Sequence, residues 1–185
     1  MTSVRIYTRK GDDGTTGLLY GGRGAKDELR FEACGTIDES VATLGMARAA
    51  MPPSDLRDLI LRIQRELFAL GAEVATSAEH HDRLDAAKGT RVDDSMVASI
   101  EAAIDDYASR TEMPKEFVIP GESPASAALD LARATVRSAE RRVVAFGRTG
   151  GLPDDAPQRY LNRLADLLFV LARHEEAGFT PLHER

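Results

Sequence analysis

The sequence predicts a single all-α domain: a five-helix bundle of four long antiparallel helices plus a shorter one, with a Gly-rich N-terminal arm. Apolar residues recur every three or four positions in five segments after residue 34, which is the period of a helix with one buried face. No segment makes a convincing strand, and the connections are short or medium in length. Helices joined in this way pack as a bundle.

The composition fits one soluble domain. The chain has 185 residues, of which 43% are hydrophobic and 29% charged, and this length is ample for one core. The net charge of −6 argues against a general nucleic-acid binder, so any phosphate binding must be local. The single cysteine, Cys34, excludes an internal disulfide and is expected to be a small buried residue. Without a signal peptide or a membrane-spanning run, we expect a cytoplasmic protein.

The first 34 residues differ from the rest. Glycines favour close approach of the backbone to an anion and disfavour a helix. Threonine hydroxyls and cationic side chains accompany them, and the polar set comprises Thr8, Thr15, Thr16, Arg9, Lys10 and Lys26. The spacing matches neither the P-loop nor the dinucleotide-binding pattern. Two interpretations stay open, a phosphate cradle and a surface arm.

Three helices follow. The first is expected to begin at Gly35 or Thr36 and to end before the prolines at 52 and 53. Asp38 and Glu39 would then occupy its first turn, where the helix dipole favours acids. The second is expected over residues 54–76 and the third over residues 93–110, with a serine and an aspartate as their respective N-caps.

The fourth expected helix spans residues 123–147 and carries two stripes. Ser123 can cap it and Gly147 can end it. One stripe is apolar and comprises Ala128, Leu131, Ala132, Thr135, Val136, Ala139, Val143 and Phe146. The other holds Arg133, Arg137 and Arg141, which lie on one face because they are four residues apart. Guanidinium groups grip phosphate or carboxylate oxygens in pairs, although a solvated basic face is the simpler alternative.

The fifth expected helix can be capped by Asp155 and has a broad apolar face. Asn162 lies close to that face, so it is either a packing specifier or a ligand contact. Before the fourth helix, the run from Phe117 to Ile119 is expected to be extended. The last eight residues are expected to be loosely held.

Four blocks of the sequence resemble the PduO-type ATP:cob(I)alamin adenosyltransferases. They are YTRKGDDGTTGLLYGG (7–22), KDELRFEACGTIDES (26–40), FVIPGESPASAALDLARATVRSAERRVV (117–144) and YLNRLADLLFVLAR (160–173). The resemblance implies one cobalamin adenosyltransferase-like domain over residues 1–185, with a nucleotide-binding arm (1–34), a helix bundle (35–177) and a tail (178–185). It implies a homotrimer with sites between subunits. It also implies transfer of the 5′-deoxyadenosyl group of ATP to the cobalt of cob(I)alamin, which gives adenosylcobalamin and triphosphate.

The resemblance also implies roles for particular residues. The positions that match ATP contacts are Thr8, Arg9, Lys10, Gly11, Thr16, Gly17, Lys26, Arg137, Glu140, Arg141 and Asn162. Arg137 is also the expected catalytic residue, together with Asp38 and Arg133, which in this family pair across the subunit interface or support the site. Phe117 matches an aromatic that excludes the lower ligand of cobalamin, and Phe169 is expected to line the same pocket. Mg²⁺ would be held mainly through the ATP phosphates, with no metal site made by the protein.

Two departures from the family pattern and one alternative function remain. Glu122 stands where the family often has glycine, and near the corrin it is expected to alter substrate preference. Ser138 replaces an arginine near the ATP contacts. The alternative function is an adenosylcobalamin escort, or a nucleotide-sensing bundle, without turnover. A cobalamin reductase and an adenosylcobalamin-dependent mutase are the expected protein partners; no nucleic acid and no membrane is expected.

Overall fold

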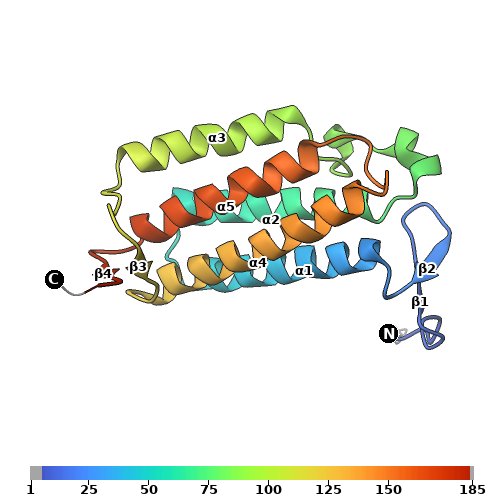
Figure 1. Ribbon diagram of the computed structural model, residues 1–185, viewed down its shortest axis with the longest axis horizontal. Helices are drawn as coiled ribbons and strands as arrows, with labels where there is room; N and C mark the ends of the chain where they lie inside the picture. The colour runs from blue at the N-terminus through green and yellow to red at the C-terminus, as the bar shows by residue number, and fades with distance from the viewer. Residues whose placement is uncertain (1–5, 184–185) are drawn as a thin grey trace, which may run out of the picture.

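The computed structural model describes residues 6–183, and within them five α-helices form the bundle (Figure 1). The helices are α1 (Leu29–Ala49), α2 (Asp55–Val74), α3 (Asp94–Ser109), α4 (Pro124–Gly147) and α5 (Ala156–His174). The shorter helix is α3, with 16 residues against 19 to 24 for the others. The predicted all-α bundle is therefore confirmed. The first five residues of the predicted arm and the last two of the predicted tail lie outside the described residues.

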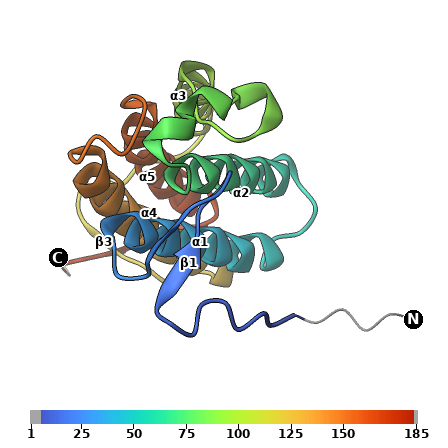
Figure 2. The ribbon, with the colours of Figure 1, turned by 90° about the vertical axis from the view of Figure 1, so that its right-hand side faces the viewer.

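The helices pack in a defined order around one core. Helix α4 lies between α1 and α5, α2 packs on the other side of α1, and α3 packs against α5 (Figures 1 and 2). The largest fully buried side chains come from all five helices and include Ile37, Ile60, Ile100, Leu129 and Tyr160. Burial of such side chains is the main stabilising contribution to a fold of this kind. None of the described helices has the length and hydropathy needed to cross a membrane.

The predicted N-caps of three helices are confirmed. Ser54 Oγ accepts from the backbone amide of Arg57 at 3.2 Å, and Asp93 Oδ1 accepts from the amide of Met96 at 3.0 Å. At the start of α4, Ser123 forms a reciprocal capping box. Asp155 occupies the predicted N-cap of α5, but its side chain makes no capping hydrogen bond, and Asp154 Oδ1 accepts from the amide of residue 156 instead.

The predicted start of the first helix at Gly35 or Thr36 is wrong. Helix α1 begins at Leu29, so the end of the predicted arm is helical. Arg30 explains this extension, because its guanidinium donates to the carbonyls of Val74 and Thr76 at 3.3 and 2.6 Å. These tertiary contacts outweigh the local glycine. Asp38 and Glu39 consequently lie mid-helix, so the helix dipole does not account for either acid.

One member of the predicted apolar stripe of α4 is also misplaced. Leu131 is 47% exposed, whereas Leu129 is fully buried. The buried stripe repeats every three or four residues, and comprises Ala125, Leu129, Ala132, Val136, Ala139, Val143 and Phe146. Residue 131 lies about 100° around the helix axis from residue 132, which belongs to this stripe.

Two small sheets lie at opposite ends of the bundle (Figure 1). At one end β1 (Thr15–Gly17) pairs with β2 (Arg23–Ala25), and the hairpin is attached to the end of α2 where the amide of Leu19 donates to the carbonyl of Ala75 at 2.9 Å. The described part of the arm is therefore a hydrogen-bonded hairpin. Two short 3₁₀ helices, Ala78–Arg83 and Ala86–Lys88, follow α2.

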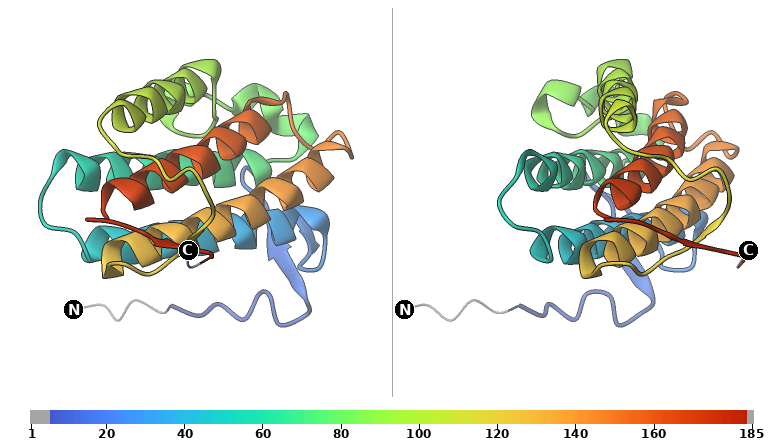
Figure 3. Two further views of the ribbon diagram at one scale, coloured as in Figure 1. Left: turned by 60° about the vertical axis from the view of Figure 1, so that its left-hand side comes forward. Right: turned by 90° about the vertical axis from the view of Figure 1, so that its left-hand side faces the viewer.

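At the other end, β3 (Val118–Ile119) pairs antiparallel with β4 (Thr180–Pro181). The extended run predicted after Phe117 is thus confirmed. The expectation of a loosely held tail is wrong, because the tail supplies the partner strand of that run. Figure 3 shows the tail crossing from the end of α5 past the start of α4.

Candidate functional site

A hollow of about 470 Å³ lies between α4 and α5. It is lined by Arg137, Glu140, Arg141, Val144, Arg148 and Asn162. Four of these six were predicted as ATP contacts. The sequence analysis missed Val144 and Arg148, although Arg148 follows Arg141 by seven residues and thus continues the same face. Three guanidinium groups against one carboxylate give the hollow a positive charge that suits an anion.

Hydrogen bonds orient the polar side chains of this hollow. Asn162 Nδ2 donates to Glu140 Oε1 at 3.0 Å, and Asn162 Oδ1 accepts from Arg163 at 2.6 Å. Asn162 is exposed, so the interpretation of a buried packing residue is wrong. Arg141 Nη2 donates to Ser138 Oγ at 2.8 Å, so the serine that replaces an arginine here contacts one of the predicted ATP residues.

A second hollow, of about 320 Å³, lies within the arm. It is lined by Thr8, Lys10, Gly11, Thr15, Thr16, Gly17, Arg23 and Lys26. Six of these residues were predicted as ATP contacts. Thr15 was named only among the polar residues of the arm, and Arg23 was not singled out. Arg9 does not line the hollow; its guanidinium lies 5.5 Å from the ring centroid of Tyr7, and its φ of 61° marks a turn.

The hairpin fixes the cations of the arm. Arg23 Nε donates to Thr15 Oγ1 at 2.9 Å, and the same guanidinium also donates to the carbonyl of Lys10. Lys26 Nζ donates to the carbonyl of Gly11 at 2.8 Å. A Cβ at Gly11 would lie 3.0 Å from the carbonyl oxygen of Thr15, a tight contact, so this approach favours glycine. Three cations beside threonine hydroxyls suit a polyphosphate.

An acid beside the arm hollow is held ionised. Asp13 Oδ1 accepts from the backbone amide and the hydroxyl of Thr15 at 2.9 and 2.8 Å. These hydrogen bonds, together with the nearby Arg23 guanidinium, lower the pKa of Asp13. The arm therefore keeps its turn geometry at neutral pH.

The two hollows do not merge within one chain. Their lining residues do not overlap, and the hairpin of the arm crosses α1 to reach the end of α2, as Figure 2 shows. The structure thus brings the predicted ATP residues other than Arg9 together as two groups, one on the arm and one on the helices.

The remaining predicted residues also fall into separate places. Asp38 is exposed on α1 and lines a mainly apolar hollow of about 340 Å³ beside Cys34 and Phe68. Arg133, on α4, donates to Asp130 at 3.4 Å, and its guanidinium lies 5.9 Å from the ring centroid of Phe169. Asp38 and Arg133 are therefore not paired within the chain.

Two further residues were singled out from the sequence. The side chain of Phe117 is 82% exposed beside β3 and lies outside the core. Cys34 is only partly buried, but burial raises the pKa of its thiol to about 11. A thiol of that pKa is a poor nucleophile at neutral pH.

Comparisons with known proteins identify the family. Residues 6–175 match the family model described as cobalamin adenosyltransferase. The chain is 44% identical to a corrinoid adenosyltransferase of Citrobacter freundii over 172 residues, which are 93% of this chain and 95% of the relative. The chain belongs to the cobalamin adenosyltransferase family. The predicted resemblance is thereby confirmed.

Solved structures of the cobalamin adenosyltransferase family agree in fold. A variant PduO-type ATP:corrinoid adenosyltransferase from Lactobacillus reuteri, complexed with cobalamin and ATP, superposes with a TM-score of 0.86. It is 26% identical in sequence, and the match covers 97% of this chain and all of that one. A second variant of the same enzyme, complexed with ATP, gives the same TM-score at 26% identity.

Proposed function

We propose that this protein transfers the 5′-deoxyadenosyl group of ATP to the cobalt of cob(I)alamin and releases triphosphate. Membership of the cobalamin adenosyltransferase family establishes adenosyl transfer to cobalamin as its reaction class. The observation that carries the assignment to this chain is the hollow between α4 and α5. It gathers Arg137, Glu140, Arg141 and Asn162 around one anion-binding space.

ATP is proposed to bind both hollows at once. Lys10, Arg23 and Lys26 on the arm would hold the triphosphate, with threonine hydroxyls and the close backbone of Gly11. Arg137 and Arg141 would neutralise phosphate oxygens from α4. Mg²⁺ would arrive with the nucleotide and stay bound mainly through its phosphates, as this ion commonly does.

A second copy of the chain is proposed to complete each site. The separation of the arm from the α4–α5 hollow supports this arrangement. Within one chain, each hollow holds only part of the proposed ATP-binding residues. The exposed acid Asp38 and the guanidinium of Arg133 would then pair across the interface. A homotrimer closes such head-to-tail contacts.

The corrin is proposed to bind near Phe117 and Phe169. The exposed ring of Phe117 would cover the lower face of cobalt and exclude the lower ligand. Without that ligand, cobalt(II) is four-coordinate and easier to reduce. Phe169, half-buried beside Arg133, would line the same pocket.

The transfer then needs positioning and electrostatics rather than proton transfer. The electron pair of cobalt(I) attacks the ribose C5′, the C5′–oxygen bond breaks, and triphosphate leaves with that bonding pair. The cobalt carries the nucleophilic chemistry, so the protein orients the reactants. Arg137 and the arm cations stabilise the negative charge that develops on the departing triphosphate.

We further propose that the protein acts in the cytoplasm. Its electron donor would be a cobalamin reductase, and its product would pass to an adenosylcobalamin-dependent mutase. Cob(I)alamin demands a reductant and adenosylcobalamin is a coenzyme, so both partners follow from the chemistry of the proposed reaction.

An anaerobic assay tests the proposed reaction. Purified protein is mixed with chemically reduced cobalamin, Mg²⁺ and ATP, and the corrin spectrum is followed. We expect conversion to the adenosylated form at a rate that saturates with ATP. Binding of ATP without product would favour the escort or nucleotide-sensing alternative, and absence of both would refute the proposal.

A further inference from the structure

The segment that carries Phe117 is paired with the C-terminal tail. Val118 and Ile119 pair antiparallel with Pro181 and Thr180, and the amide of Leu182 donates to the carbonyl of Phe117 at 2.8 Å. A two-residue strand has little stability of its own. The position of the exposed Phe117 ring therefore depends on where the tail lies.

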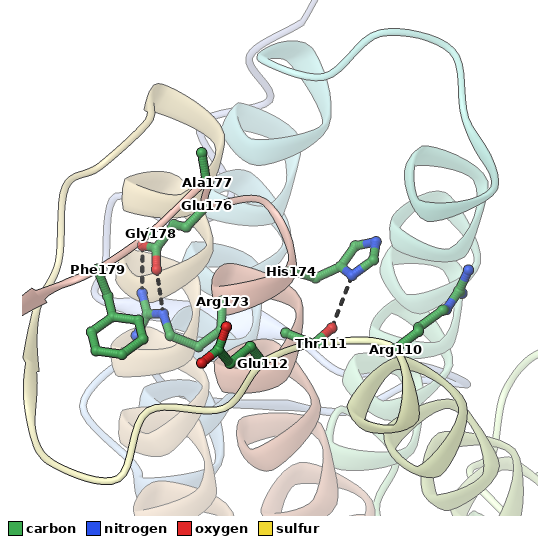
Figure 4. A pocket seen from close by; sticks show the side chains of 9 residues that line it. All are labelled: Arg110, Thr111, Glu112, Arg173, His174, Glu176, Ala177, Gly178 and Phe179. Atoms are coloured by element: carbon green, nitrogen blue, oxygen red, sulfur yellow. Dashed lines mark hydrogen bonds and ion pairs between the residues drawn. The ribbon is translucent and has the colours of Figure 1, made fainter.

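The tail is itself anchored where it leaves α5. Arg173 Nε and Nη2 donate to the two carboxylate oxygens of Glu176 at 2.7 and 2.8 Å (Figure 4). Arg173 Nη2 also donates to Asp130 Oδ2 at 2.5 Å. The side chains of Arg173 and Glu176 are only 2% exposed. Bidentate pairs of this kind are geometrically restrictive. This cluster fixes the residues just before the tail against α4 and α5.

A second anchor lies at the strand pair itself. Thr180 Oγ1 donates to Glu122 Oε1 at 2.6 Å. Glu122 stands between Gly121, whose φ of 131° makes the turn after β3, and Ser123, which caps α4. The carboxylate thus joins the β3–α4 turn to the tail at the residue that pairs with Ile119.

We propose that Glu122, through Thr180, positions Phe117 over the lower face of cobalt. The inference rests on the proposed function, in which Phe117 excludes the lower ligand. Glu122 is then a positioning residue that acts through the tail and not a direct corrin contact. This replaces the expectation that its carboxylate alters substrate preference. A charge-assisted hydrogen bond on one side of a two-residue strand is well placed to hold that strand in register.

The test compares Thr180→Val and Glu122→Ala with the unchanged full-length protein. Cob(II)alamin and MgATP are bound, and the fraction of four-coordinate cobalt(II) is measured by electron paramagnetic resonance. We expect each variant to reduce the ratio of four- to five-coordinate cobalt about three- to tenfold, the effect of losing one hydrogen bond. The KM for ATP should stay unchanged because the ATP hollows lie elsewhere. Glu122→Gln, which keeps an acceptor oxygen for Thr180, should restore most of the ratio.

Two controls separate the possible failures. Thr90→Val removes a hydroxyl that hydrogen-bonds within the loop after α2, and it should leave the cobalt spectrum unchanged. Phe117→Ala should abolish the four-coordinate form. If Phe117→Ala changes the spectrum but Thr180→Val and Glu122→Ala do not, this inference is wrong and the proposed function stands. If Phe117→Ala has no effect either, the proposed role of Phe117 is wrong.

Discussion

At the scale of single residues, the cations on α4 and α5 divide into two groups. Arg142 faces Glu32 at 3.5 Å, and Arg163 donates to Glu101 at 3.0 Å, so each is partnered on the surface. Arg137 instead lines the α4–α5 hollow, where the carboxylate of Glu140 already accepts from Asn162. An arginine placed in this way is available for an anionic ligand.

Arg137→Ala should therefore reduce turnover by about 10²–10³-fold, the loss typical of a pre-organised charged donor. Arg142→Ala is the matched control, because it removes an arginine from the same helix that does not line the hollow. Initial rates under saturating ATP measure both, and circular dichroism checks that both variants remain folded. Near-normal turnover of Arg137→Ala would contradict the assignment of this residue.

Cys34 gives a second prediction at this scale. Its pKa of about 11 leaves about 100-fold less thiolate at pH 8 than the ordinary value of 9.0 would. The folded protein should react with iodoacetamide about 100-fold more slowly than the urea-unfolded chain. Mass spectrometry of timed samples measures this rate, and every adduct reports Cys34 because no other cysteine is present. Equal rates in the two states would contradict the raised pKa.

At the scale of elements, a buried acid joins α2 to the loop before α3. Glu73 is fully buried, and its Oε2 accepts from the backbone amide of Val92 at 2.9 Å. Its Oε1 has no hydrogen-bond partner in the described part of the chain. Burial raises the pKa of Glu73 to about 7, and the hydrogen bond from Val92 only partly opposes this shift.

Glu73 therefore predicts a pH dependence of stability. Between the unfolded value near 4.5 and about 7, the folded state binds more protons, so stability from this group falls as pH rises through that window. Glu73→Gln removes the ionisation and keeps an acceptor for Val92. The difference in Tm between Glu73→Gln and the unchanged protein should rise from pH 5 to pH 8, by roughly 5–10 °C. Thermal scans at fixed protein concentration measure it; Glu39→Gln, at an exposed site on α1, should show no such trend.

The elements also show what the sequence could predict. The starts of α2 to α5 were placed within one residue because apolar periodicity and the residues that precede a helix are local signals. The start of α1 was missed because Arg30 is held by carbonyls more than forty residues away. The arginine face of α4 was predicted because a helical spacing of four is visible in the sequence, whereas the ATP roles of its residues came from the family resemblance. The role of Arg23 depends on a hairpin register, with Gly17 opposite Arg23, that no local signal specifies.

At the scale of the whole molecule, the proposed ATP-binding residues are divided between two hollows, and this division bears on how the subunits assemble. The arm precedes α1 (Figure 2), and its hollow shares no lining residue with the one between α4 and α5. Lys10 lines the arm hollow and Arg137 lines the α4–α5 hollow, and we call these hollows the two halves of the proposed ATP site. If each working site combines the arm of one subunit with the helices of another, subunits damaged in different halves can complement each other.

Co-expression of Lys10→Ala and Arg137→Ala subunits tests this arrangement. Each variant alone should be nearly inactive, whereas random mixed trimers should recover about one quarter of the normal activity, since one arm–helix junction in four joins two intact halves. Co-expression of the unchanged chain with the double variant, Lys10→Ala plus Arg137→Ala, is the matched control. It should also give about one quarter for sites between subunits, but about one half for sites within a chain. If the mixture of single variants stays inactive while the control shows about one half of the normal activity, the proposed site between subunits is contradicted.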